Sequence, residues 1–330
     1  MKWLLDLLGI NAMRPGDELE EAVEHVVEGI DPRLRLVPGY RRKLLPALQK
    51  AIAHIDQTVD RIPGPLELSR KAYIDVPEVK AFFASADELE NLVRDNSEIS
   101  SLLRCGQVPH ALDAWALLCV TKQEKRIIGM DLAGNDIRRG VAQTAVNFYD
   151  HKIMAPATDE DALRSGIKKC IFDGLITYAL QRILELKAQR RELEDQRRIL
   201  HARLRARQAV GNGLSHLIAS ATDSDQQIEN IEGDLRLAEG RLRQLPASDQ
   251  VLGGYLDEIQ KVMSQPAEFI QMNEVCLRLN NMGIKVDTDA AHPVNTVCFT
   301  ELEIAQVLKR VVTVVHFSCV LTAEQRLASS

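Results

Sequence analysis

The feature that most constrains the fold is a run of residues spaced alternately three and four apart. This spacing is typical of the contact line, or seam, of a coiled coil. The members of the run are Ile176, Ala179, Ile183, Leu186, Arg190, Leu193, Arg197, Leu200, Leu204 and Arg207. The run predicts a long helix that packs lengthwise against a second helix.

A second seam with the same spacing follows after a break. Its members are Ile228, Ile231, Leu235, Ala238, Leu242 and Leu245. Gly211 and Gly213 lie between the seams, and a short connection favours antiparallel neighbours. We therefore predict an antiparallel coiled-coil hairpin over residues 176–245. The facing pairs expected from a turn near Ser215 are Leu186 with Leu245, Leu193 with Ala238, and Leu200 with Ile231.

The charges of the two predicted helices agree with this pairing. Residues 185–207 carry eight Lys or Arg and four Asp or Glu, whereas residues 223–245 carry three and six. A basic helix beside an acidic one is favourable, although each exposed ion pair contributes only about 0.2 to 1 kcal/mol. Arg190 and Arg197 interrupt the first seam, and the sequence predicts that they contact a partner. Their expected neighbours within the hairpin are Asp234 and Glu239.

Three apolar residues lie outside both seams, at the expected tip of the hairpin: Leu214, Leu217 and Ile218. An isolated two-helix arm cannot bury all three. They would either seal the turn or dock into a protein partner or a second copy. An arm of about thirty residues reaches roughly 45 Å, enough to bridge the subunits of an assembly.

The composition is that of a soluble globular protein without a general attraction to polyanions. Of the 330 residues, 45% are hydrophobic and 27% are charged, and the formal net charge is −6. The basic helix has no aromatic residue between Tyr178 and Tyr255 on which bases would stack, so we find no specific nucleic-acid signal. The six cysteines form no CxxC pair, which suits a reducing, cytoplasmic compartment, and we expect most of them to be small core residues.

No metal or cofactor site is predicted. Cys276, His292 and Cys298 carry metal-ligand atoms, as do His316 and Cys319, but the spacing of either set matches no common zinc pattern. The stretch from Gly129 to Gly140 lacks both the GxGxxG and the phosphate-loop signatures.

The first ten residues contain an apolar run that is broken by Asp6. Together with the polar stretch at 14–17, this break argues against a cleaved export signal. The apolar residues Trp3, Leu4, Leu7 and Leu8 would line one face of a helix at a membrane interface, but the basic face expected for anionic lipid is absent. We therefore favour a short helix docked on the protein itself, and keep membrane contact through residues 1–10 as an alternative.

Residues 17–104 have the pattern of helices separated by prolines. Helices are expected over 17–29 and 40–61, and a third begins at Pro77. Ser85 and Glu88 have the spacing of a capping box that starts another helix. Residues 1–110 are therefore predicted to form an N-terminal helical module.

From Ala111 onwards the apolar period changes from that of helices to that of strands. Strands are expected over 115–121 and 126–132 around a polar turn at 122–125, and a third strand over 141–149 after a turn at Gly134-Asn135. Thr158 with Asp161 predicts the N-cap of the first hairpin helix.

After Pro246 we expect two more helices and two more strands. The helices cover 251–263 and 267–282, and the strands cover 296–304 and 311–319, with a helix over 301–309 as the competitor. The predicted class is α+β, mainly α-helical. A small antiparallel-sheet domain, formed by residues 111–175 and 246–330, is interrupted by the inserted hairpin of residues 176–245.

Asp150-His151, at the end of a predicted strand, is the first candidate for acid–base chemistry, because a carboxylate can orient an imidazole of near-neutral pKa. Adjacent strand residues point apart, however, and no nucleophile accompanies the pair. An enzyme with a divergent site near Asp131, Asp150 and His151, using the coiled coil to dimerise, stays an alternative.

These patterns identify an architecture and no reaction. We expect a non-enzymatic scaffold or adaptor that uses the coiled-coil hairpin for protein–protein interaction or self-association. The enzyme near Asp131, Asp150 and His151 is the second hypothesis. A membrane-peripheral adaptor anchored by the N-terminal segment is the third.

Overall fold

A computed structural model describes residues 17–105, 111–133, 136–213, 221–245, 251–286, 294–305 and 308–320. Helices make up 60% and strands 29% of these residues. The predicted mixed, mainly helical class, with an antiparallel sheet and a long helix, is confirmed.

The chain divides into two compact units, and it crosses between them inside the helices α3 (Tyr40–Asp60) and α8 (Glu160–Gly213). Of the described residues, the sheet unit takes 50–173 and 265–320, and the helical unit takes 17–49 and 174–264, so the chain crosses a third time after Ser264. This division differs from the predicted boundaries. Among the described residues, the helices after Leu68 pack on the sheet, whereas the helix that begins at Asp17 belongs to the helical unit.

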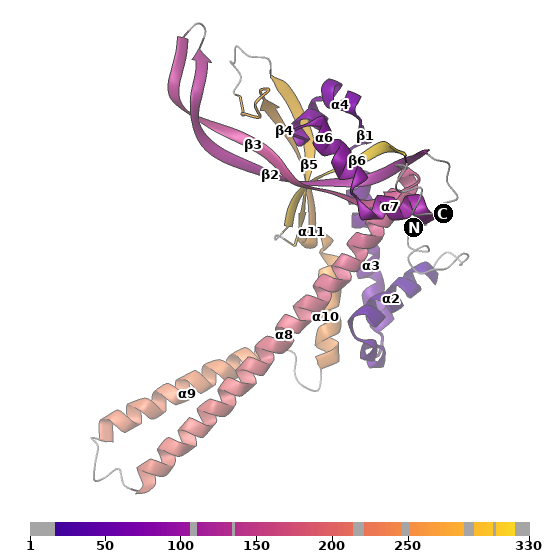
Figure 1. Ribbon diagram of the computed structural model, residues 1–330. Helices are drawn as coiled ribbons and strands as arrows, with labels where there is room; N and C mark the ends of the chain where they lie inside the picture. The colour runs from indigo at the N-terminus through magenta and orange to yellow at the C-terminus, as the bar shows by residue number, and fades with distance from the viewer. Residues whose placement is uncertain are drawn as a thin grey trace. The chain divides into compact units, whose positions relative to one another are not determined.

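The sheet unit is built on one six-stranded sheet with the strand order β3-β2-β6-β5-β4 (Figure 1). The strands are β1 (Leu66–Glu67), β2 (Ala111–Ala133), β3 (Asp136–Ala157), β4 (Ile270–Leu279), β5 (Asn295–Ile304) and β6 (Leu308–Val320). Neighbours along this order are antiparallel. The short strand β1 is outside this order and pairs in parallel with the middle strand β6, at Val315 and His316. The predicted strands at 141–149, 296–304 and 311–319 are thus confirmed within β3, β5 and β6.

The polar turn predicted at 122–125 is wrong, because β2 runs through it as one strand. Each residue from Lys122 to Lys125 has a partner in β3. The strand tolerates these polar side chains because they are exposed to solvent or form ion pairs. Lys122 pairs with Glu301 at 2.5 Å, and Glu124 pairs with Lys285 at 2.7 Å. The predicted turn at Gly134-Asn135 lies outside the described residues.

The helix predicted over 267–282 is also wrong. Only Pro266–Phe269 is helical, as α11, and the chain then continues as β4. Apolar residues at a spacing of three and four had suggested a helix, but β4 pairs with β5 along its whole length. The backbone pairing with a strand distant in sequence outweighs the local pattern.

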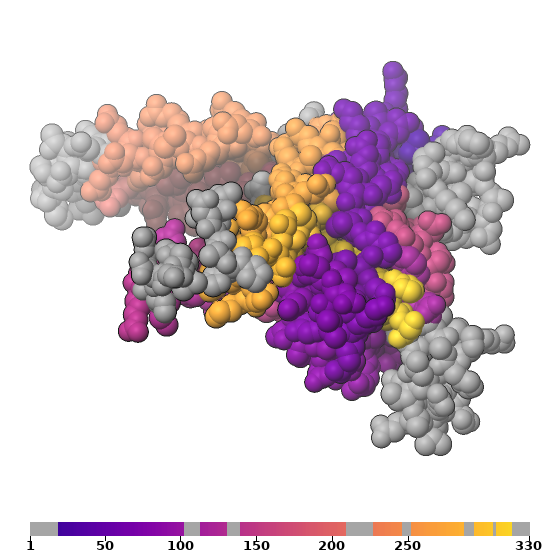
Figure 2. All heavy atoms as spheres, turned by 90° about the horizontal axis from the view of Figure 1, so that it is seen from above, coloured from indigo at the N-terminus to yellow at the C-terminus, as the bar shows by residue number. Residues whose placement is uncertain are grey.

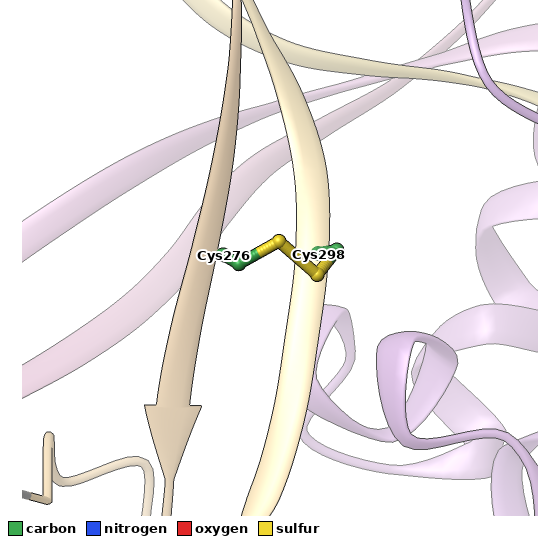
Figure 3. The surroundings of a disulfide bond; sticks show 2 residues. All are labelled: Cys276 and Cys298. Atoms are coloured by element: carbon green, nitrogen blue, oxygen red, sulfur yellow. A yellow bond between two sulfur atoms is a disulfide. The ribbon is translucent and has the colours of Figure 1, made fainter.

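One disulfide joins these two strands. Cys276 and Cys298 face each other in the β4–β5 register, and Figure 3 shows the bond bridging the two ribbons. Both residues are exposed. The expectation that most cysteines are unpaired core residues is therefore wrong for this pair, because the strand pairing brings them together. Cys119 does fit it: burial raises the pKa of its thiol to about 11.

Four short helices cover one face of the sheet. They are α4 (Arg70–Asp75), α5 (Pro77–Phe82), α6 (Ala86–Arg94) and α7 (Ser97–Cys105). Phe82, Phe83 and Leu89 are buried in one apolar cluster with Phe299 and Phe317 of the sheet. Figure 2 shows the purple atoms of these helices as one patch beside the orange-to-yellow atoms of β4 to β6.

The N-cap predicted at Ser85 is confirmed, and the return bond of the capping box goes to the residue before it. The Glu88 N–H donates to Ser85 Oγ at 3.1 Å, and the Glu88 carboxylate accepts from the Ala84 N–H at 2.8 Å. Pro77 is the first residue of α5, as expected of a residue without a backbone N–H.

The helical unit contains α2 (Asp17–Ile30), the 3₁₀ turn η1 (Pro32–Leu36), the start of α3, most of α8, and α9 (Ala221–Gln244) and α10 (Val251–Ser264). These helices, apart from the outer part of α8 and α9, contribute apolar side chains to one core. Val23, Leu48, Ile183 and Ile259 in this core are nearly or fully buried. Ion pairs tie α10 to its neighbours: Asp257 to Lys43, and Glu258 to Arg182.

Candidate protein-interaction site

The long helix α8 starts with a side-chain cap. The Ala162 N–H donates to Asp159 Oδ1 at 2.8 Å, so Asp159 satisfies an N–H that has no partner in the first turn. The predicted N-cap at Thr158 is thus displaced by one residue. No Pro interrupts the sequence from Glu160 to Gly213, which lets the helix run without a break.

The first seam changes its environment along α8. Ile176, Ala179 and Ile183 are buried in the helical unit. Leu186, Leu193, Leu200 and Leu204 are half-buried, whereas Arg197 and Arg207 are exposed. The seam therefore leaves the core of the unit after Ile183.

The second seam, on α9, is shielded to a similar degree. Ala238 is buried, and the other five members are half-buried. Figure 1 shows α9 running back beside the last part of α8. We call residues 186–213 of α8 together with α9 the arm.

The two helices of the arm meet near its middle, where His201 Nε2 lies 4.0 Å from Glu239 Oε1. The two predicted partner-binding arginines differ from each other. Arg190 is 22% exposed and pairs with Glu194 at 2.8 Å within α8, while Arg197 is exposed. Glu239 was expected beside one of these arginines, but its carboxylate lies beside His201.

At the base of the arm, α8, the end of α9 and α10 enclose a hollow of about 350 Å³. Its described lining is Leu186, Lys187, Arg190, Arg191, Glu194, Arg198, Leu245 and Tyr255. Leu186 and Leu245 both line this hollow, but the contact between His201 and Glu239 sets Ala238 beside Leu200. The predicted pairs Leu186 with Leu245, Leu193 with Ala238 and Leu200 with Ile231 are therefore displaced by about one heptad. Lys187 Nζ lies 4.5 Å from the centre of the Tyr255 ring, and burial is the main cause that raises the pKa of Tyr255.

Sequence reasoning missed Lys187 and Tyr255 as members of this site. Tyr255 was noted only as the end of a stretch without aromatic residues. The available signal was the apolar face of α10, where Tyr255, Leu256 and Ile259 follow a helical spacing and are buried. Which helix that face meets depends on contacts between residues far apart in the sequence.

Two predicted contact regions lie outside the described residues. They are the tip residues Leu214, Leu217 and Ile218, and the N-terminal residues Trp3, Leu4, Leu7 and Leu8. Within the described part of the chain, none of the helices combines the length and apolar composition that crossing a bilayer requires.

His151, the candidate acid–base residue, links β3 to the helices that cover it. Its Nε2 lies 2.7 Å from the Phe82 carbonyl oxygen, and its ring stacks on Phe83 with the centroids 4.8 Å apart. Its Nδ1 lies 3.4 Å from the Glu88 carboxylate, and its side chain is 8% exposed. These contacts are those of a residue that fastens α5 and α6 to the sheet.

The structure does not bring the other two residues of the enzyme hypothesis to His151. Asp150 pairs with Arg310 of β6 at 2.7 Å, and the hydrogen bond from Arg310 is the main cause that lowers the pKa of Asp150. Asp131 lies ten residues along β2 from Thr121, the partner of Tyr149, which is roughly 33 Å at the rise of a strand. Asp131, Asp150 and His151 therefore do not form one site.

The structure gives other contacts to the described residues that were considered for metal binding. Cys276 and Cys298 are bonded to each other, and His292 lies outside the described residues. The His316 ring packs on Trp115, with the centroids 4.9 Å apart. Among the residues that the structure describes, no group of three or more His, Cys, Asp or Glu side chains has an arrangement for a metal ion.

Comparison of the chain with protein-family models, with curated proteins and with solved structures gives no match.

Proposed function

We propose that this protein is a non-enzymatic scaffold or adaptor, and that α8 and α9 pack as an antiparallel coiled-coil hairpin that binds another protein. The observation that carries the proposal is the exposure pattern of the arm. The apolar seam residues of both helices are half-buried or buried, although they lie beyond the core of the helical unit, while charged residues such as Arg191, Arg198 and Arg203 are exposed. Two seams that shelter each other are what a coiled coil requires.

The contact between His201 and Glu239 supports this packing. Each residue directly follows a seam position, Leu200 on α8 and Ala238 on α9. In an antiparallel pair, residues that follow seam positions on both helices lie on the same flank of the arm. Their ion-pair distance of 4.0 Å agrees with that arrangement.

The opposite flank of the arm carries the surface that we assign to the partner. Ile199 and Leu237 lie two positions before His201 and Glu239, and two residues turn a helix by about 200°. Both residues therefore fall on the other flank, where they are 53% and 63% exposed. We take these two exposed apolar side chains as the centre of the contact with the partner.

The charge around this apolar pair indicates the kind of partner. Arg197 and Arg198 precede Ile199, and both are exposed. A partner with an apolar centre and an acidic rim would match this surface, because interfaces place apolar residues centrally and complementary charges at the edge. Arg190 extends the same basic helix toward the base of the arm.

The test is affinity capture with the full chain and two variants. Changing Ile199→Asp together with Leu237→Asp should remove the partner that the wild type retains, because two carboxylates would then lie in an apolar contact. Leu184→Asp is the matched control, since Leu184 is equally exposed, at 52%, but lies before the arm begins. Retention of the same proteins by the double variant and the wild type would refute recognition by this flank.

A further inference from the structure

One short segment connects β4 and β3, the two strands at opposite ends of the sheet order. We call this segment, residues 280–286, the bridge. On one side, the Val286 N–H donates to the Arg278 carbonyl oxygen of β4 at 3.0 Å. On the other side, the Lys285 N–H donates to the Thr144 carbonyl oxygen of β3 at 2.8 Å. The bridge therefore ties the β4 end of the sheet to the β3 end by backbone hydrogen bonds.

Strand β4 carries the bridge at its end and contributes one face to the core of the sheet unit. Leu279 is 3% exposed, and Val275 and Leu277 pack against the same apolar cluster, which contains Phe299 of β5. The backbone of β4 pairs with β5 over its whole length. If β4 left β5, these apolar side chains would be exposed and the bridge would be pulled away from β3.

The disulfide between Cys276 and Cys298 crosses from β4 to β5 on the other face of the sheet (Figure 3). Cys276 lies between Val275 and Leu277, and neighbouring strand residues point to opposite faces. Both cysteines are exposed, and exposed disulfides are the ones that exchange readily with thiols. The bond spans 22 positions of the sequence and encloses the whole bridge.

We infer that this disulfide is a redox-sensitive latch on β4 and the bridge. In the oxidised chain, β4 cannot leave β5, so the bridge stays on β3. In the reduced chain, β4 and the bridge can open together while β2 and β6 stay paired. The physical reason is that a cross-link removes the conformational freedom that the enclosed chain would gain on opening.

The reductant is a low-molecular-weight monothiol of the glutathione class, and two molecules of it supply two electrons and two protons. The first thiolate attacks one cysteine sulfur, so that a mixed disulfide forms and the bond between Cys276 and Cys298 breaks. The other cysteine leaves as a thiolate and takes up the proton that the first reductant lost. The second thiolate attacks the reductant sulfur of the mixed disulfide, which releases the remaining cysteine, protonated in the same way, and a disulfide of the two reductant molecules.

Reduction of the folded full chain by glutathione tests whether the bond is open to a thiol. The reaction should add two alkylatable thiols per chain, at a rate within about a thousandfold of the rate in the urea-unfolded chain. A bond that reacts only in unfolded molecules would be slower than that, because folded chains outnumber unfolded ones by about 10³ or more. Slower reduction would overturn the inference, as would a gain of thiols in the variant Cys276→Ser, Cys298→Ser.

Hydrogen exchange followed by mass spectrometry tests the latch itself. After reduction, the peptides that cover β4, the bridge and Val146, whose N–H donates to the Gly283 carbonyl oxygen, should exchange faster. Their acceleration should exceed that of the β2–β6 pairs by at least about tenfold. The variant Cys276→Ser, Cys298→Ser should exchange like the reduced chain with or without glutathione.

The matched control is Cys170→Ser, because Cys170 is an exposed cysteine outside the disulfide. This variant should exchange slowly when oxidised and respond to glutathione like the wild type. Equal acceleration over the whole sheet would show that the disulfide only stabilises the fold, and would overturn the latch. An absence of any acceleration after reduction would overturn it as well.

Discussion

Replacement of Glu301 by Gln tests the ion network that links β2 to β5 and β6. The Glu301 side chain is 5% exposed and lies between two lysines, with Lys122 Nζ at 2.5 Å and Lys309 Nζ at 2.6 Å. Lys122 also lies 3.2 Å from Glu124, which in turn pairs with Lys285. Glu301→Gln keeps the shape of the side chain and removes the one charge that both central lysines share.

The expected cost follows from the exposure of each partner. Removing one member of a buried ion pair typically costs about 3 to 5 kcal/mol, because the other charge is left without compensation. Lys309 is 55% exposed, so water replaces its lost partner, whereas Lys122 is 17% exposed and keeps Glu124. Glu301 Oε1 receives no hydrogen bond of regular geometry, so its contact with Lys122 counts as an ion pair alone. We therefore expect a loss of about 2 to 3 kcal/mol in the free energy of unfolding.

Urea unfolding followed by far-ultraviolet circular dichroism measures this loss. Glu90→Gln is the control, because Glu90 pairs with Arg70 at the surface and its replacement should leave the unfolding midpoint nearly unchanged. If Glu301→Gln changes the midpoint no more than Glu90→Gln does, the network does not stabilise the sheet and the reasoning is refuted.

The pH dependence supplies a second check on Glu301. Burial raises the pKa of Glu301, but the ion pairs with Lys122 and Lys309 outweigh it, and the net pKa lies below its usual value of 4.5. A carboxyl group whose pKa is lower in the folded state stabilises that state above its unfolded pKa, and loses this contribution as the pH falls through the folded pKa. The difference between wild type and Glu301→Gln should therefore be full at neutral pH and shrink below pH 4.5.

Four further predictions concern other parts of the chain. Gly64→Ala should lower the free energy of unfolding by about 3 kcal/mol or more, because the backbone φ is +131° and an added Cβ meets the Val314 carbonyl. Gly166→Ala in α8, where an added Cβ meets no atom within 4 Å, should instead raise the free energy of unfolding by about 0.5 to 1 kcal/mol in the same urea titration. Cys276→Ser should cost about 3 kcal/mol by opening the cross-strand disulfide loop, and a reductant should then have no further effect on the stability of that variant. Leu200→Cys with Ala238→Cys, the seam residues beside the contact between His201 and Glu239, should form an intramolecular disulfide under mild oxidation. The bond would be seen as a mobility shift on a non-reducing gel, and its absence would contradict the proposed hairpin.

Much of the secondary structure was predictable because its signal is local. The helix over 40–61 was predicted within one residue of α3, and the strands at 296–304 and 311–319 lie inside β5 and β6. The cap at Ser85 was also read correctly. Each of these depends on residues a few positions apart, whose spacing alone shows which face meets the core.

The errors share a different cause. The polar run at 122–125 resembled a turn, and the apolar spacing at 267–282 resembled a helix. Both are strands because their partners, in β3 and β5, supply backbone hydrogen bonds that the local pattern does not reveal. The same non-local pairing brings Cys276 to Cys298, which no spacing along the chain indicated.

The features of the candidate site also divide into those that the sequence indicates and those that only the tertiary structure shows. The two seams, the charge difference between their helices and the residues Arg190 and Arg197 could be read from the sequence, because helical periodicity repeats within a single segment. The hollow around Tyr255, the flank of Ile199 and Leu237, and the bridge from β4 to β3 could not. They arise where segments far apart in the chain meet or fail to meet, and only the tertiary structure determines which backbone edges are paired and which apolar faces are left uncovered.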